Sequence, residues 1–255
     1  MSADLLDHWV IARAAFFPRR CWFRSPFVIE SKGARLACSF HRADRGGLTV
    51  VHFHGNGEVV SDYLDGFPSH FTSNGHDLLL TEYRGYGMST GEVELGAMLD
   101  DVEQVIRGTG VDPERIVLFG RSIGSIFALE GAARFPRVAG LILESAIAEP
   151  MASLRMRGVS HEDLGVTPEA FAAAVGDRLN HQRKMAAYGG KTLVLHALFD
   201  DLVDVTNAER LASWAGGPVT LRIFDRGHHN TMRVDNEAAY FGAVKEHLAV
   251  CGRAP

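Results

Sequence analysis

The stretch Ile116-Val117-Leu118-Phe119-Gly120-Arg121-Ser122-Ile123-Gly124 decides the fold expected of this 255-residue chain. Its first four residues form an apolar run typical of a strand buried on both faces of a sheet. The residues after Ser122 continue as a helix to Arg134. A serine between glycines, where a strand turns at once into a helix, is the pattern of a nucleophile elbow. We therefore expect the Ser122 hydroxyl to stand clear of the sheet, available for chemistry.

The same G-x-S-x-G pattern occurs earlier in the chain around Ser89, but its context differs. Ser89 follows the glycine-containing loop 83–87 several residues after the nearest strand candidate, and Gly91 and Glu92 separate it from the next helix. A residue in such a loop is typically a turn residue. The context therefore favours Ser122 as the nucleophile.

Short apolar runs alternate with helix-length segments along most of the chain. The expected strands are Phe27–Glu30, Ala34–Phe40, Leu48–Phe53, Asp77–Glu82, Arg115–Phe119, Val138–Leu143, Thr192–His196 and Val219–Phe224. The expected helices are Gly96–Arg107, Ile123–Arg134, Asn207–Trp214 and Glu237–Val250. Because parallel strands need crossovers that return over one face, this alternation predicts a doubly wound α/β fold, in one domain over residues 1–255.

The segment Ala146–Gly190 breaks this alternation because it is much longer than a crossover requires. We expect one crossover helix plus an insertion. Since the segment follows the carboxyl end of a strand, the insertion is expected to lie over the site as a cap.

An acid and a base follow the last two strands. Asp200 comes four residues after His196, and His228-His229 follows the final strand. A serine hydroxyl needs a histidine base that a carboxylate orients, so the chain order serine, acid, histidine fits a catalytic triad. Asp200 is the preferred acid, Asp201, Asp204 and Glu144 are its rivals, and the spacing does not choose between His228 and His229.

The loop after the Leu48–Phe53 strand reads His54-Gly55-Asn56-Gly57. An oxyanion hole needs two backbone N–H donors, and glycines allow a loop to turn an amide inward. We therefore expect the Asn56 amide and the Ile123 amide, directly after the nucleophile, to hold the oxyanion.

The composition is that of an ordinary soluble globular protein, with 46% hydrophobic and 22% charged residues. The formal net charge of −5 gives no basic surplus for binding nucleic acid. No apolar segment is long enough to span a membrane, and the region Trp9–Phe17 lacks the features of a signal peptide. We expect a cytoplasmic protein without stable membrane insertion.

Three dispersed cysteines, Cys21, Cys38 and Cys251, indicate neither a zinc ribbon nor a disulfide scaffold. His52 and His54 could share one face of a strand, but no third metal ligand is evident nearby. Neither a Walker loop nor a G-x-G-x-x-G fingerprint is present. We therefore expect neither a metal nor an organic cofactor.

The chain resembles the α/β-hydrolase superfamily, and more narrowly its small esterase-like serine hydrolases and the depalmitoylase-like ABHD proteins. The matching residues are His54-Gly55-Asn56-Gly57, the stretch Tyr83–Gly91, Gly120–Gly124, Asp200 and His229-Asn230. The resemblance implies a mostly parallel eight-stranded sheet and places the catalytic histidine at His229. One departure is Ala197, where the family usually has glycine after the strand's histidine.

These features predict a serine hydrolase that cleaves carboxylic esters, or thioesters, through an acyl-enzyme on Ser122. Its partner would be a small-molecule acyl substrate. The alternatives are a peptidase or amidase of the same fold, and a ligand-binding protein that has lost turnover. Dehalogenases and epoxide hydrolases carry aspartate at the elbow, where this chain has Ser122.

Overall fold

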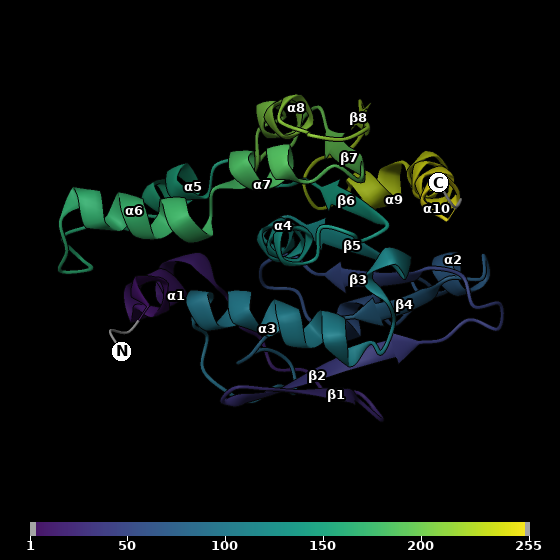
Figure 1. Cartoon of the computed structure of the whole chain (residues 1–255), viewed down its shortest axis with the longest axis horizontal. Helices are drawn as coiled ribbons and strands as arrows, with labels where there is room; N and C mark the ends of the chain where they lie inside the picture. Colours follow the sequence, from purple (N-terminus) through teal and green to yellow (C-terminus); the bar gives the residue numbers. More distant parts are fainter. Residues whose placement is uncertain (1–3, 253–255) are drawn as a thin grey trace.

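A computed structural model describes residues 4–252, in which the strands form one sheet of order β1-β2-β4-β3-β5-β6-β7-β8 (Figure 1). The strands are β1 (Phe27–Ser31), β2 (Ala34–His41), β3 (Thr49–Phe53), β4 (Asp77–Leu80), β5 (Ile116–Arg121), β6 (Gly140–Glu144), β7 (Lys191–Ala197) and β8 (Val219–Phe224). Strands β1 and β2 pair antiparallel, β2 pairs antiparallel with β4, and all other neighbours are parallel. The predicted fold, a mostly parallel sheet of eight strands, is confirmed.

Helices cover both faces of the sheet. The α-helices are α1 (Trp9–Ala15), α2 (Ser69–Thr72), α3 (Leu95–Gly108), α4 (Gly124–Arg134), α5 (Pro150–Met156), α6 (Pro168–Arg178), α7 (His181–Ala187), α8 (Thr206–Ser213), α9 (Met232–Asp235) and α10 (Glu237–Cys251). Short 3-10 turns occur at η1 (Leu5–Asp7), η2 (Val60–Tyr63) and η3 (Pro113–Arg115). Helices α3, α4 and α8 lie on one face, and α10 lies on the other with α2 (Figure 1).

Strand β5 occupies the middle of the parallel region, between β3 and β6, and all six of its residues are buried. Burial on both faces explains the unbroken apolar run of its first four residues. Helix α4 begins directly after it, packs on β5, β3 and β6, and is flanked by α3 and α7. Strand β5 therefore delivers Ser122 to the centre of the sheet's carboxyl edge, where doubly wound folds bind their ligands.

The long segment 146–190 contains α5, α6 and α7. Helix α7 packs against α4 and α8, as a crossover helix should. Helices α5 and α6 project beyond the sheet, at the left of Figure 1, where they lie against α1 and η1. The segment thus consists of α7, which packs as a crossover helix, and of the projecting helices α5 and α6 with their loops, which we call the insertion.

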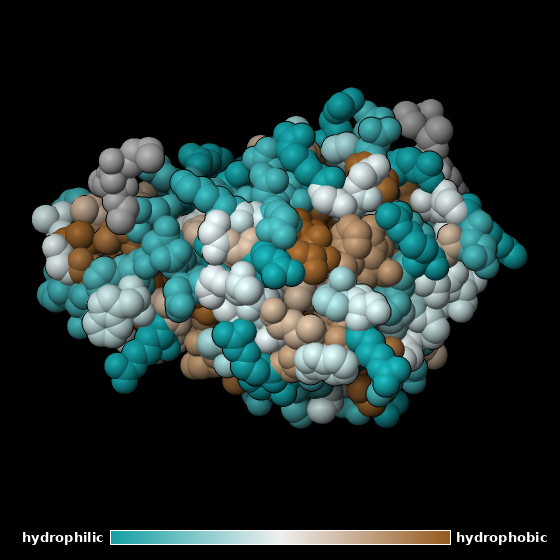
Figure 2. Space-filling model, turned by 90° about the horizontal axis from the view of Figure 1, so that it is seen from below, coloured by the Kyte–Doolittle hydropathy of each residue, from teal (hydrophilic) through white to brown (hydrophobic). Residues whose placement is uncertain are grey.

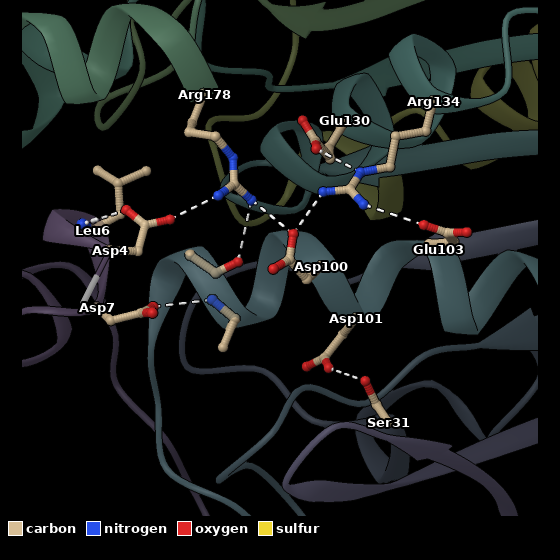
Figure 3. Close-up of polar contacts among 12 residues, drawn as sticks. Asp4, Leu6, Asp7, Ser31, Asp100, Asp101, Glu103, Glu130, Arg134 and Arg178 are labelled. Carbon is tan, nitrogen blue, oxygen red and sulfur yellow. Dashed lines mark hydrogen bonds and ion pairs between the residues drawn. The ribbon is translucent and has the colours of Figure 1, made fainter. Parts of the chain in front are cut away.

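Helix α6 is held to the rest of the molecule by a network of ion pairs (Figure 3). Arg178, at the end of α6, pairs with Asp4 at 2.7 Å and with Asp100 of α3 at 2.9 Å. Asp100 also pairs with Arg134 of α4 at 2.7 Å. These contacts join the insertion to the N-terminal segment and to the helices that cover the sheet.

Hydrophilic residues cover most of the surface seen in Figure 2, from the side where β1 and β2 lie, and leave smaller hydrophobic areas between them. Across residues 4–252, none of the helices combines the length and apolar character needed to cross a lipid bilayer.

Candidate active site

Ser122 lies at a sharp turn between β5 and α4, and its backbone has a φ of +52°. A positive φ is uncommon for any residue but glycine and is costly in free energy, so the surrounding structure must hold it in place. The Ser122 amide donates to the Glu144 carbonyl of β6 at 2.8 Å, which continues the pairing of the two strands into the turn. This is the local geometry that a nucleophile elbow requires.

The two flanking glycines are required by close backbone contacts rather than by unusual φ values. A Cβ on Gly120 would lie 2.6 Å from the Gly124 carbonyl oxygen and from Cα of Ser125. A Cβ on Gly124 would lie 2.1 Å from the Phe53 carbonyl oxygen of β3. Both clashes involve backbone atoms, which cannot move aside as a flexible side chain can.

The loop after β8 brings His229 to the serine. Its Nε2 lies 3.0 Å from the Ser122 Oγ, and its Nδ1 lies 2.8 and 2.9 Å from the two carboxylate oxygens of Asp200. All three residues are buried or nearly so, and they come from the carboxyl ends of β5, β7 and β8. The structure therefore brings together the serine, acid and histidine that sequence analysis singled out.

The Asp200 carboxylate is held by its own loop as well as by His229. Its Oδ1 accepts hydrogen bonds from the amides of Val203 at 2.8 Å and Leu202 at 3.0 Å. Burial alone would raise the pKa of Asp200, but the hydrogen bonds from His229 and these amides outweigh it and hold the pKa at about 2. Asp200 is thus ionised near neutral pH and orients the imidazole with Nδ1–H toward itself, which leaves Nε2 as the acceptor facing Ser122.

The rival residues lie elsewhere or have other partners. His228 is half-exposed, and its Nδ1 faces Asp201 at 3.5 Å. The Asp204 carboxylate accepts the Thr206 amide at 3.0 Å, at the start of α8. The Glu144 carboxylate accepts the Tyr240 hydroxyl at 2.6 Å. Among residues 4–252, none of these three side chains forms a hydrogen bond with the Ser122 hydroxyl, whose partner is His229.

Ser89 and Ala197, which sequence analysis also singled out, have structural contacts of their own. The Ser89 hydroxyl is buried and accepts the Ala37 amide of β2 at 2.9 Å, and within residues 4–252 it forms no hydrogen bond with Ser122, Asp200 or His229. Ala197, the departure from the family pattern, is fully buried at the end of β7, and its carbonyl accepts the Asp200 amide at 3.2 Å. The alanine therefore leaves the acid loop able to reach His229.

The Asn56 loop faces Ser122 across the same cavity as Ile123. Within residues 4–252, neither the Asn56 nor the Ile123 amide donates to a backbone carbonyl. The Asn56 side chain points to the N-terminal segment, where it accepts the Phe17 amide at 2.9 Å and donates to the Ala15 carbonyl at 2.8 Å. Its side chain thus fixes the loop and leaves its backbone N–H for another acceptor.

The cavity at Ser122 has a volume of about 390 Å³ and draws on several segments of the chain. Apolar side chains of the N-terminal segment, the insertion and the acid loop form much of its wall, together with the polar site residues. Its lining residues are Phe17, Asn56, Arg121, Ser122, Ile123, Ile147, Ser153, Met156, Arg157, Leu202, Val203, His229 and Asn230. The insertion therefore contributes directly to the space in which a substrate would lie.

The two histidines considered as metal ligands have other partners. His54 Nε2 lies 2.8 Å from the buried Glu82 carboxylate, and this pairing raises the pKa of His54 although burial alone would lower it. His52 packs among the rings of Tyr63, Phe67 and Phe119. In residues 4–252 we find no cluster of three or more histidine, cysteine or carboxylate side chains arranged to hold a metal.

Sequence analysis missed the role of Arg121, which lies inside the elbow motif and is buried. Its guanidinium pairs with Glu58 and Glu144 and donates to the His229 carbonyl. A signal was available, because a charged residue directly after a buried strand needs a partner. The sequence could not say which carboxylates would supply it.

In this doubly wound sheet, a central strand ends in a strained serine, and an acid and a histidine follow the last two strands. This arrangement is characteristic of α/β-hydrolases. The chain belongs to the α/β-hydrolase superfamily. The family described as serine aminopeptidase, S33, matches residues 47–173. Among relatives, the chain is 27% identical over 196 residues to the uncharacterized protein YfhR of Escherichia coli K12, covering 73% of this chain and 64% of that protein.

It is also 30% identical over 190 residues to human alpha/beta hydrolase domain-containing protein 17C, covering 71% of this chain and 53% of that protein. The chain thus spans less than two thirds of the length of these relatives. Among solved structures, an esterase from Exiguobacterium antarcticum matches 88% of this chain and 100% of its own, with a TM-score of 0.67 and 16% identity. A monoacylglycerol lipase from Paleococcus ferrophilus matches 85% of this chain and 99% of its own, with a TM-score of 0.65 and 15% identity. Both likenesses concern the fold.

Proposed function

We propose that this protein is a serine hydrolase that cleaves small carboxylic esters, with thioesters as the second substrate class. The observation that carries the proposal is the 3.0 Å contact between His229 Nε2 and the Oγ of Ser122 at a positive-φ elbow. An imidazole whose Nδ1–H is bound by Asp200 presents its Nε2 lone pair to the serine hydroxyl. This is the arrangement that activates a serine as a nucleophile.

In the first half of the reaction, Ser122 Oγ attacks the acyl carbonyl carbon while its proton passes to His229 Nε2. The carbonyl π electrons move to the oxygen, and the backbone N–H groups of Asn56 and Ile123 bind the resulting oxyanion. The intermediate then collapses, the bond to the leaving group breaks, and His229 protonates the departing alcohol or thiol. An acyl group remains on Ser122.

In the second half, water attacks the acyl-enzyme and gives its proton to His229 Nε2. Collapse of the second oxyanion releases the carboxylic acid, and the proton returns from His229 to Ser122 Oγ. Asp200 stays ionised throughout and stabilises the imidazolium that forms in each half. The apolar parts of the cavity wall suit the acyl chain.

The cavity also bears on the peptidase alternative. An aminopeptidase must bind a free, cationic amino terminus, for which a carboxylate is the natural partner. The described lining residues include no Asp or Glu, and its fully charged members are Arg121 and Arg157. Because Arg121 is paired with Glu58 and Glu144, the cavity favours a neutral acyl substrate over a cationic peptide amino terminus.

The test is a hydrolysis panel of p-nitrophenyl butyrate, a butyryl thioester and alanine p-nitroanilide. We expect turnover to be fastest for the ester and slowest for the anilide. Ser122→Ala and His229→Gln should each lower kcat steeply, on the order of 10⁶-fold for a lost serine. His228→Gln is the matched control and should stay within about twofold of wild type. Ester turnover that survives Ser122→Ala would overturn the proposal.

A further inference from the structure

Arg121 has no part in the reaction just described, yet its side chain is only 9% exposed and its guanidinium contacts the backbone of His229. Its Nη1 lies 2.8 Å from the Glu58 carboxylate, and its Nε lies 3.3 Å from the Glu144 carboxylate. Burial alone would lower the pKa of Arg121, but the acidic groups around it, Tyr63, Glu144 and Glu58, outweigh this and raise it. Arg121 is therefore a permanent buried cation directly beside Ser122.

One group of these contacts involves the loop 54–57, which carries the Asn56 amide. The second oxygen of Glu58 accepts the Gly55 amide and the Tyr63 hydroxyl, both at 2.6 Å. A Cβ on Gly55 would lie 2.5 Å from Arg121 Nη1 and 2.8 Å from the Glu58 carboxylate. Glycine at position 55 thus allows the guanidinium and its carboxylate to pack directly against the loop. The backbone of Gly55 immediately precedes the Asn56 amide.

The other group of contacts involves the histidine loop. Arg121 Nη2 donates to the backbone carbonyl of His229 and to the Asn230 side-chain oxygen, each at 3.2 Å. These contacts hold the chain directly after the Cα that carries the His229 side chain. The Ser122 amide in turn donates to the Glu144 carbonyl. The Arg121 guanidinium therefore connects the three loops that carry the nucleophile, the base and the oxyanion donors.

We propose that Arg121 is a positioning residue that sets the spacing of the Asn56 amide and His229 relative to Ser122. The proposal rests on the proposed function, because spacing of these groups matters only if they act together. The planar, forked guanidinium reaches both loops at once, whereas a lysine ammonium is a single point that cannot span them. Displacement of a catalytic group by about 1 Å can cost about 100-fold in rate.

The principal variant is Arg121→Lys, which keeps the buried charge and so avoids leaving Glu58 and Glu144 unpaired. We expect kcat for p-nitrophenyl butyrate to fall about 100-fold while KM stays within about threefold. Binding of a trifluoromethyl ketone, which forms an oxyanion on the serine, should weaken in parallel with kcat. A residue with a purely structural role would leave both quantities unchanged in the folded protein.

The matched control is Arg84→Lys. Arg84 is also a buried arginine, 5% exposed, and pairs through two nitrogens with Asp101 at 2.6 and 2.7 Å, without contact to the triad. We expect Arg84→Lys to lower the Tm while kcat stays within about twofold of wild type. The proposal is overturned if Arg121→Lys lowers the Tm in the same way and keeps kcat within threefold.

A second experiment compares the effect of Glu58→Gln on kcat in the wild-type and Arg121→Lys backgrounds. Glu58→Gln should lower kcat about tenfold in the wild-type background but less than threefold in the Arg121→Lys background, because the coupling to the loop is already lost there. An equal factor in both backgrounds would contradict the proposal. If wild type hydrolyses no ester and does not react with a fluorophosphonate, the proposed function itself fails, and this inference with it.

Discussion

Gly124 shows how closely the backbone at the elbow is packed. Its Cα faces the Phe53 carbonyl of β3, so the methyl group of Gly124→Ala would displace either α4 or β3. We expect this substitution to lower the free energy of unfolding by about 1–3 kcal/mol and to reduce ester turnover. Chemical denaturation measures the first effect.

The matched control is Gly176→Ala within α6, where a Cβ meets nothing within 4 Å. There the substitution should stabilise by about 0.5–1 kcal/mol, because alanine loses less backbone entropy than glycine in a helix. Equal effects at the two positions would show that backbone packing does not require glycine at Gly124.

Asp200 makes a pH-dependent contribution to stability. Its folded pKa of about 2 lies below the ordinary 3.8, so ionised Asp200 stabilises the folded state, by about 2 kcal/mol. A depressed carboxyl pKa gives stability that is fully present above about pH 4 and is lost as the pH falls toward 2.

The measurement is the difference in unfolding free energy between wild type and Asp200→Asn from pH 7 to 3. We expect that difference to shrink below about pH 4. Exposed Asp201→Asn is the control and should give a small difference at every pH. A wild-type advantage that stays constant down to pH 3 would refute the assignment.

Among single residues, sequence analysis could predict the site residues that directly follow strands. It could not predict those, such as Arg121, whose role depends on contacts with residues distant in the sequence. Ser122, Asp200 and the pair His228-His229 could be picked out because each comes shortly after an apolar strand run, and only the family resemblance preferred His229. Spacing could not choose between His228 and His229, since adjacent residues in a loop can each point either way. The contact of Arg121 with Glu58 joins segments 63 residues apart (121 − 58), and no local pattern encodes such a pair.

Among the elements, α6 depends on ion pairs rather than on a large apolar face. Arg178 and Asp4 are each less than one third exposed, at 28% and 29%, so their pair is only partly screened by solvent. We expect Arg178→Gln to cost about 1 kcal/mol locally and to speed amide hydrogen exchange in residues 168–178 about fivefold. Strand β5 should exchange at its wild-type rate.

The control is Arg155→Gln on the neighbouring helix α5, since Arg155 is exposed and forms no ion pair among the described residues. Its exchange pattern should match that of wild type. Unchanged exchange in α6 of Arg178→Gln would mean that apolar packing, chiefly of Phe171 and Val175, holds the insertion in place.

The strands and long helices could be predicted because local patterns encode them. All eight expected strands are present; Val219–Phe224 has the expected ends, and the others differ by one or two residues at one or both ends. For example, β4 stops at Leu80 rather than Glu82, whose side chain turns to bind His54. The three helices of segment 146–190 were not resolved individually, because their apolar residues serve contacts with several distant elements at once.

For the molecule as a whole, the central claim is that three loops at one edge of the sheet activate a single serine. The most direct test is intact-mass spectrometry after treatment with a fluorophosphonate, which labels only an activated serine. We predict one adduct on wild type and none on Ser122→Ala. An adduct that survives this substitution, or the absence of any adduct on folded wild type, would contradict the account.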